Sequence, residues 1–174
     1  YLQPKVKIEI SCMSMDEPYE NRTLTSLIYD SFNEVDDSTQ CIIPTVLPIR
    51  TFLEKAFLLN EEYQKKVPRS ERMSRHLYDI ERLMDTCSDA AINDAELYKN
   101  IIEHRKKFYH ISSVDYESDK REQIKIWPIG EIEQLFKEDY NAMIESFIYN
   151  ENPLTFVQLK ERILELEAKF RNDV

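Results

Sequence analysis

The sequence predicts an α+β fold in which two short strands precede a mainly α-helical region. Apolar and polar side chains alternate over residues 5–12, and residues 41–47 form a second short apolar run. From Pro48 onward, apolar residues recur every three or four positions, which is the spacing of one helix face. We therefore expect two regions, residues 1–48 with the strands and residues 49–174 with the helices.

The first region is expected to form only part of a sheet. Residues 24–32 predict a short helix, and the acidic residues 33–40 predict a loop. Pro44 removes a backbone donor from the second strand, which favours a position at a sheet edge. Because two strands alone are marginally stable, we expect their free edge to pair with sequence upstream of Tyr1.

The second region is divided into helices by prolines, one glycine and polar segments. Pro48 suits the first turn of a helix, and Pro68 ends that helix. Thr155 and Gln158 have the spacing of a capping box at the start of the last helix. The expected segments are helices over residues 48–67, 70–86, 89–109, 131–147 and 156–170, a polar loop over 112–123, and an extended run over 124–129.

The composition excludes several function classes. The 174 residues contain one glycine, Gly130, whereas a P-loop or a dinucleotide-binding turn needs several. The formal net charge of −10 argues against a general nucleic-acid coat protein, although it leaves room for a local basic groove. Three cysteines without CxxC spacing favour reduced thiols in a cytoplasmic protein over disulfides or zinc. No apolar run approaches the roughly 18 to 20 residues that cross a membrane.

Two single residues are candidates for phosphate or metal chemistry. Glu9 lies on the polar face of the first predicted strand, where a carboxylate can ligate a divalent metal ion or simply face solvent. Lys55 lies in the middle of a predicted helix among apolar residues. Its ammonium group can reach a triphosphate as a point charge, or it can be an ordinary surface lysine with its stem on apolar neighbours.

A third candidate is one face of the helix predicted over residues 70–86. Arg75, Asp79 and Arg82 lie at positions i, i+4 and i+7, so they share a face. That face can bind phosphate through arginine and provide a base or metal ligand through Asp79, or it can be a solvated row of ion pairs. Residues 49–75 carry seven basic and four acidic residues, which favours a phosphate-rich substrate.

With these candidates in this order, the chain resembles the C-terminal half to two-thirds of members of the AbiEii/AbiGii toxin family of nucleotidyltransferases. Four segments carry the resemblance: Lys-Ile-Glu-Ile-Ser at 7–11, Phe-Leu-Glu-Lys-Ala at 52–56, Ser-Arg-His-Leu-Tyr-Asp-Ile at 74–80, and Asp139-Tyr140-x-x-Met143. The resemblance implies the end of a polymerase-β-like nucleotidyltransferase sheet followed by a helical domain. It also implies a nucleoside triphosphate substrate, an RNA acceptor such as the tRNA acceptor end, and a cognate antitoxin.

The resemblance also implies roles for individual residues. Glu9 would be a catalytic carboxylate and a ligand of Mg²⁺, which clamps the triphosphate for in-line transfer. Lys55 would bind nucleotide phosphates as a catalytic residue, and Asp79 would be the acid of the last motif. Arg75 and Glu54 would support nucleotide binding.

Two departures from the family pattern favour an alternative. His76 stands where the family commonly has an acid, and the 174 residues contain neither the Gly-Ser turn nor the Asp-x-Asp strand. We expect those motifs upstream, so this piece alone would be inactive. The alternative is a catalytically incomplete helical module that binds an antitoxin or another protein. A third interpretation is a purely structural helical domain.

Overall fold

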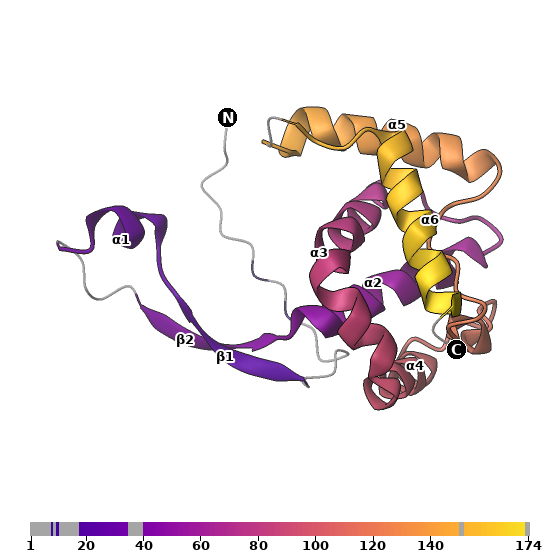
Figure 1. Cartoon of the computed structure of the whole chain (residues 1–174), viewed down its shortest axis with the longest axis horizontal. Coiled ribbons are helices and arrows are strands. Elements are labelled where there is room, and N and C mark those ends of the chain that lie inside the picture. The colour runs from indigo at the N-terminus through magenta and orange to yellow at the C-terminus, as the bar shows by residue number, and fades with distance from the viewer. Residues whose placement is uncertain (1–7, 9, 11–17, 35–39, 150–151, 173–174) are drawn as a thin grey trace.

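A computed structural model describes residues 8, 10, 18–34, 40–149 and 152–172, and these form a helix-rich α+β fold (Figure 1). The elements are β1 (Tyr19–Leu24), α1 (Leu27–Phe32), β2 (Cys41–Val46), α2 (Pro48–Tyr63), α3 (Ser74–Asn93), α4 (Ala95–Phe108), the 3₁₀ helix η1 (Tyr116–Asp119), α5 (Glu131–Phe147) and α6 (Phe156–Asn172). The predicted α+β class is confirmed, with a small sheet and a larger helical body.

The two strands pair in an antiparallel hairpin that extends to one side of the helices (Figure 1). Tyr19 lies opposite Val46, and Leu24 lies opposite Cys41. Apolar side chains on this hairpin and on α1 are solvent-exposed, with Ile42 at 70% and Leu27 at 85%. The described sheet therefore does not bury an apolar face of its own.

The sequence correctly predicts β2 but not β1. The strand expected over residues 5–12 lies outside the described residues except for Ile8 and Ile10, which are exposed and belong to no helix or strand. β1 covers the segment YENRTL, which has no alternating apolar face. Its strand conformation depends on backbone pairing with β2, which the side-chain pattern does not indicate. The helix predicted from residue 24 begins only after Ser26, whose hydroxyl accepts a hydrogen bond from the backbone N–H of Tyr29.

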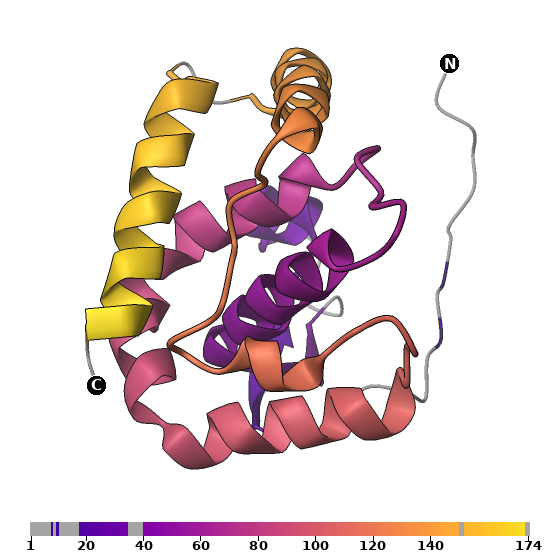
Figure 2. The same cartoon turned by 90° about the vertical axis from the view of Figure 1, so that its right-hand side faces the viewer.

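The helical body is built around α2 (Figure 2). α2 contacts α3, α4 and η1, while α3 also contacts α4, α5 and α6. Apolar side chains from α2, α3, α4, α5 and α6 form one core, and the fully buried members of α2 are Phe52, Leu53, Ala56, Phe57 and Leu59. The apolar residues that recur every three or four positions in the sequence are thus the ones that face the core.

The predicted break between the second and third helices is displaced. α3 begins at Ser74 and continues through residues 87–88 to Asn93, because no glycine or proline interrupts it and Ala91 and Ile92 extend its buried stripe. Asp94 ends α3 and also caps α4, where its carboxylate accepts a hydrogen bond from the Leu97 amide at 2.9 Å.

The last two helices begin as predicted, and α6 ends at Asn172, two residues beyond the predicted end. α5 follows Gly130, whose φ of 75° is a backbone conformation that suits glycine. At the start of α6, the Thr155 amide donates to Gln158 Oε1 at 2.9 Å, and the Gln158 amide donates to Thr155 Oγ1 at 3.3 Å. The predicted capping box is therefore present.

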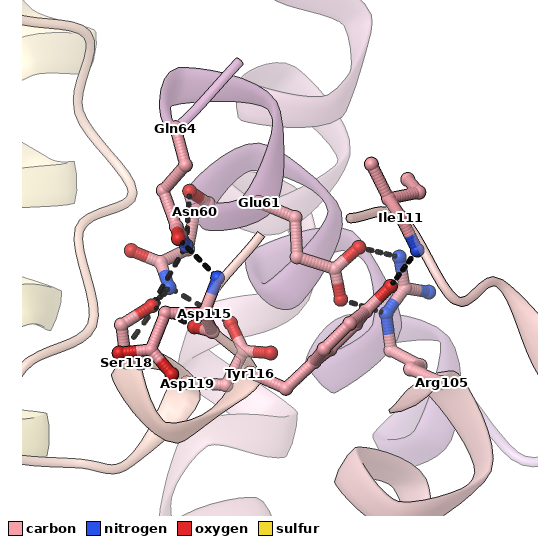
Figure 3. Close-up of polar contacts among 9 residues, drawn as sticks. All are labelled: Asn60, Glu61, Gln64, Arg105, Ile111, Asp115, Tyr116, Ser118 and Asp119. Atoms are coloured by element: carbon pink, nitrogen blue, oxygen red, sulfur yellow. Dashed lines mark hydrogen bonds and ion pairs between the residues drawn. The ribbon is translucent and has the colours of Figure 1, made fainter. Parts of the chain in front are cut away.

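Buried polar residues on α2 bind two further elements (Figure 3). Glu61 accepts hydrogen bonds from Arg105 of α4, with Nε–Oε1 and Nη2–Oε2 distances of 2.5 and 2.7 Å. Asn60 Nδ2 donates to the Ser118 hydroxyl at 3.0 Å and to Asp119 Oδ1 at 2.8 Å. Residues 112–123, which the sequence predicts as a loop, thus contain a helical turn held by buried hydrogen bonds.

Asp119 is a buried acid whose environment opposes ionisation. Its side chain is fully inaccessible, and its Oδ2 atom has no hydrogen-bond partner among the described residues. Burial, reinforced by the nearby Glu61 carboxylate, raises the pKa of Asp119 from 3.8 to about 7. Asp119 therefore keeps its proton to a higher pH than an exposed aspartate does.

We predict that Asp119→Asn removes a decline in stability between pH 4 and pH 7. The unfolded acid loses its proton near pH 3.8, whereas the folded acid keeps it to about pH 7, so folding stability falls as pH rises across this window. The asparagine amide replaces the acid proton and does not titrate. In urea unfolding, the variant should gain about 2 to 4 kcal/mol relative to the native protein from pH 4 to pH 7. Parallel pH profiles would contradict the assignment.

We predict that Arg105→Ala lowers the free energy of unfolding by about 3 to 5 kcal/mol, because it leaves Glu61 buried without its cation. Lys99→Ala is the control on the same helix, since Lys99 pairs with Glu103 at 3.6 Å with both side chains more than 60% exposed. That control should change stability by less than about 1 kcal/mol. Equal effects of the two substitutions in urea unfolding would show that the buried pair is unimportant.

Candidate functional site

Lys55 and Asp79, two of the predicted site residues, form an ion pair between α2 and α3. The distance from Lys55 Nζ to Asp79 Oδ2 is 2.7 Å, although the residues are 24 positions apart in sequence. The Lys55 side chain is 22% exposed and that of Asp79 is 41% exposed. The pair therefore lies at the surface edge of the α2–α3 contact, where a ligand can reach it.

Apolar packing on the inner faces of the two helices sets this position. Ala56 of α2 and Leu77 and Ile80 of α3 are fully buried in the common core. Their neighbours Lys55 and Asp79 consequently project from the rim of the α2–α3 contact. Arg75 lies one helical turn before Asp79 and is exposed.

His76, which replaces the acid of the family pattern, is neutral at physiological pH. Burial lowers the pKa of His76 to about 4, and the positive charges of Lys55 and Arg75 act in the same direction. Its Nδ1 atom is buried and has no hydrogen-bond partner in the described part of the chain. His76 therefore adds no charge beside the ion pair.

Of the remaining predicted site residues, Glu54 pairs with a cation other than Lys55, and Glu9 is not described. Glu54 pairs with Arg50 on the same helix, and the distances from Arg50 Nε and Nη2 to Glu54 Oε1 are 3.1 and 2.9 Å. Glu9 lies outside the described residues. Among the residues that are described, no three His, Cys, Asp or Glu side chains form a group that could hold a metal ion.

A groove between α3 and α5 adjoins the ion pair and has a volume of about 480 Å³. Arg75 and Asp79 line it, together with Arg72 and Tyr78 of the same region. The opposite wall consists of α5 and the residues that follow it: Asp139, Ala142, Met143, Ser146, Phe147 and Ile148. Asp139 and Met143 of this wall belong to the family resemblance, but the sequence predicts no site role for them, because the apolar residues of α5 are equally consistent with core packing.

Asp139 fixes the geometry of this groove by capping α3. Its carboxylate accepts hydrogen bonds from the backbone amides of Arg72 and Ser74 at 2.6 and 2.9 Å, and from the Ser74 hydroxyl at 2.5 Å. A carboxylate at a helix N-terminus also interacts favourably with the helix dipole. Asp139 belongs to the last motif of the resemblance, but its partner lies more than 60 residues away and no local spacing could identify it.

A second cavity, of about 950 Å³, lies where Asn60 and Gln64 of α2 face the segment that contains η1. Its lining is mainly amides, hydroxyls and charged residues that bond one another, including Gln64 Nε2 to Ser118 Oγ at 2.7 Å and the Asp115 amide to Gln64 Oε1 at 2.7 Å (Figure 3). Because Lys55 and Asp79 do not line it, this cavity is separate from the predicted site.

One of three comparisons with known proteins identifies a family for this chain. No significant match was found among curated proteins or among solved structures. No helix in the described part of the chain is long and apolar enough to span a membrane. The family model for the nucleotidyl transferase AbiEii toxin of type IV toxin–antitoxin systems matches residues 1–169. The resemblance inferred from the sequence motifs is thereby confirmed, and the chain belongs to the AbiEii family of toxin-type nucleotidyltransferases.

Proposed function

We propose that this protein transfers a nucleotide from a nucleoside triphosphate to an RNA acceptor, with Lys55 and Asp79 at the centre of the site. The acceptor end of tRNA is the candidate acceptor, and an antitoxin is the candidate regulator. Family membership supports nucleotidyl transfer. The observation that carries the residue assignment is the 2.7 Å contact between Lys55 and Asp79, which brings two separate family motifs together.

Lys55 binds the phosphates of the incoming nucleotide. Its ammonium group is partly exposed and already faces a carboxylate oxygen, which has the same charge sign as a phosphate oxygen. Arg75 lies exposed on the adjacent turn of α3 and adds a second positive charge. Phosphoryl-group transfer depends chiefly on positioning and electrostatic stabilisation, so a fixed cation at this place contributes directly to the rate.

Asp79 holds Lys55 in the free protein and serves as the proton acceptor during transfer. In this step an acceptor hydroxyl forms a bond to the α-phosphorus of the nucleotide. The bond between the α-phosphorus and the bridging oxygen breaks, and pyrophosphate leaves with the electron pair. The hydroxyl proton passes to Asp79, whose carboxylate is partly exposed.

We also propose that transfer depends on Mg²⁺ with Glu9 as a ligand, and this part rests on the family resemblance. The described residues do not by themselves form a group that fits a metal ion. The roles of Lys55 and Asp79 are therefore argued from their charge and contact. Glu54 supports the site indirectly, since it holds the buried guanidinium of Arg50, which lies one turn before Glu54 on α2.

The exposed hairpin supports a division into residues 1–48 and 49–174. β2 passes through Leu47 directly into α2, which carries Lys55. Both strands have mostly exposed side chains, as expected for part of a larger sheet. We assign residues 1–48 to the end of a polymerase-β-like nucleotidyltransferase sheet and residues 49–174 to the helical domain that completes the nucleotide site.

The second candidate function is an antitoxin-binding or other protein-binding module without transfer activity. Neutral His76 and the exposed apolar side chains of the hairpin and α1 favour it. Under this alternative the native protein binds a protein partner but transfers no nucleotide.

We predict that Lys55→Ala and Asp79→Ala each reduce nucleotide transfer at least 100-fold, since loss of a fixed electrostatic group at a reacting centre costs about 10² to 10³ in rate. The measurement is incorporation of an α-³²P-labelled nucleoside triphosphate into RNA by the native full-length protein. Thermal melting should change little, because partly exposed ion pairs contribute about 1 kcal/mol or less.

The matched control is Lys169→Ala. Lys169 Nζ also pairs with an α3 aspartate, Asp89, at 2.7 Å, but ten residues along the helix from Asp79. This variant should melt like Lys55→Ala and retain full transfer. Full transfer by Lys55→Ala would remove Lys55 from the site, and absence of transfer by the native protein would favour the binding module.

A further inference from the structure

The groove between α3 and α5 is lined by two arginines, Arg72 and Arg75, that have no acidic partner in the described part of the chain. Neither Arg72 nor Arg75 forms an ion pair with any described residue, whereas nearby Arg69 pairs with Glu62 at 2.7 Å and Lys55 pairs with Asp79. Acids outnumber bases in this chain by 33 to 23. Unpaired guanidinium groups on such an acidic chain favour binding of an anionic ligand, such as phosphate, which would form ion pairs with them.

The backbone at Arg72 is held in a conformation that side-chain-bearing residues seldom adopt. Its φ is 58°, and its amide donates to Asp139 at 2.6 Å. Residues in such conformations cluster at binding sites, where the surrounding structure holds them in place. Asp139 thereby anchors the backbone of Arg72, which lines the groove.

The opposite wall of the groove is apolar and includes an aromatic ring open to solvent. Met143, Phe147 and Ile148 line this wall, and Phe147 is 73% exposed. Tyr78 provides a second ring from the α3 side. Apolar and aromatic surfaces beside a few charged groups are typical of small-molecule sites, and a volume of about 480 Å³ suits a nucleotide.

We propose that this groove binds the nucleoside part of the donor nucleoside triphosphate. The base packs against Phe147 and Tyr78, and the triphosphate extends past Arg72 and Arg75 to Lys55. This inference rests on the proposed function, because Arg75 and Asp79 line the groove and also belong to the phosphate site. The groove adjoins the Lys55–Asp79 pair through Asp79, which lines it.

The test compares two ligands by isothermal titration calorimetry of the full-length protein. The ligands are ATP and inorganic tripolyphosphate, which share the phosphate chain but differ in the nucleoside. Phe147→Ala should weaken ATP binding about tenfold, as expected for loss of one aromatic contact with a base, and leave tripolyphosphate binding within about twofold. Lys55→Ala should weaken both ligands by similar factors. Leu135→Ala is the control, since Leu135 is an exposed apolar residue on the same helix that does not line the groove.

The two proposals fail in different ways. If Lys55→Ala weakens both ligands but Phe147→Ala leaves ATP binding unchanged, the phosphate site stands and the groove inference is overturned. If Lys55→Ala leaves both ligands unaffected, the proposed function loses its central residue. If ATP binds no more tightly than tripolyphosphate to the native protein, no nucleoside pocket exists. Equal weakening of ATP by Leu135→Ala and Phe147→Ala would also contradict the groove inference.

Discussion

The fold depends on one constraint: α2 is a buried central helix that carries charged and amide side chains. A buried polar group without a partner costs roughly 1 to 3 kcal/mol, and an unpaired buried charge costs more. Glu61 therefore holds α4 through Arg105, and Asn60 holds η1 through Asp119. Burial acts to raise the pKa of Glu62, but hydrogen bonds from Arg69 and Lys65 lower it to about 2. These hydrogen bonds also hold the segment between α2 and α3 against α2. Polar pairing on α2 thus positions the elements around it.

The Lys55–Asp79 pair also joins α2 to a neighbouring helix, but its side chains are more exposed than those of the buried pairs. The Glu61 and Arg105 side chains are each less than 5% exposed, so solvent and ligands do not reach their charges. Lys55 and Asp79 are 22% and 41% exposed, so a phosphate can replace the carboxylate as the partner of Lys55. The buried pairs hold the helices in place, whereas this rim pair is available for chemistry. Its position beside the α3–α5 groove links the structural role of α2 to the proposed nucleotide site.

Local sequence signals predicted much of the helical body, because the apolar period and the capping residues act over a few positions. They placed the starts of α2, α5 and α6 correctly, although α2 ends at Tyr63, before the predicted end at residue 67. Family motifs selected Lys55 and Asp79 as candidates for one site. Features that depend on distant partners were missed. β1 lacks an alternating pattern, so only its pairing with β2 defines it. The cap that Asp139 provides for α3 and the bond between Asn60 and η1 join residues about 60 positions apart. The wall formed by Phe147 is also defined only by tertiary packing.

The most direct test of the central claim is nucleotide transfer by the charge-swapped double variant Lys55→Asp/Asp79→Lys. The swap restores an ion pair between α2 and α3, so the double variant should melt close to the native protein. The swap also puts an aspartate at position 55, where its negative charge repels the phosphate that Lys55 is expected to bind. Our account predicts that transfer remains at least 100-fold below the native rate despite the restored pair. Recovery of transfer to within a few-fold of the native rate would show that the pair only joins the two helices, and would contradict the assignment of Lys55 as a phosphate-binding residue.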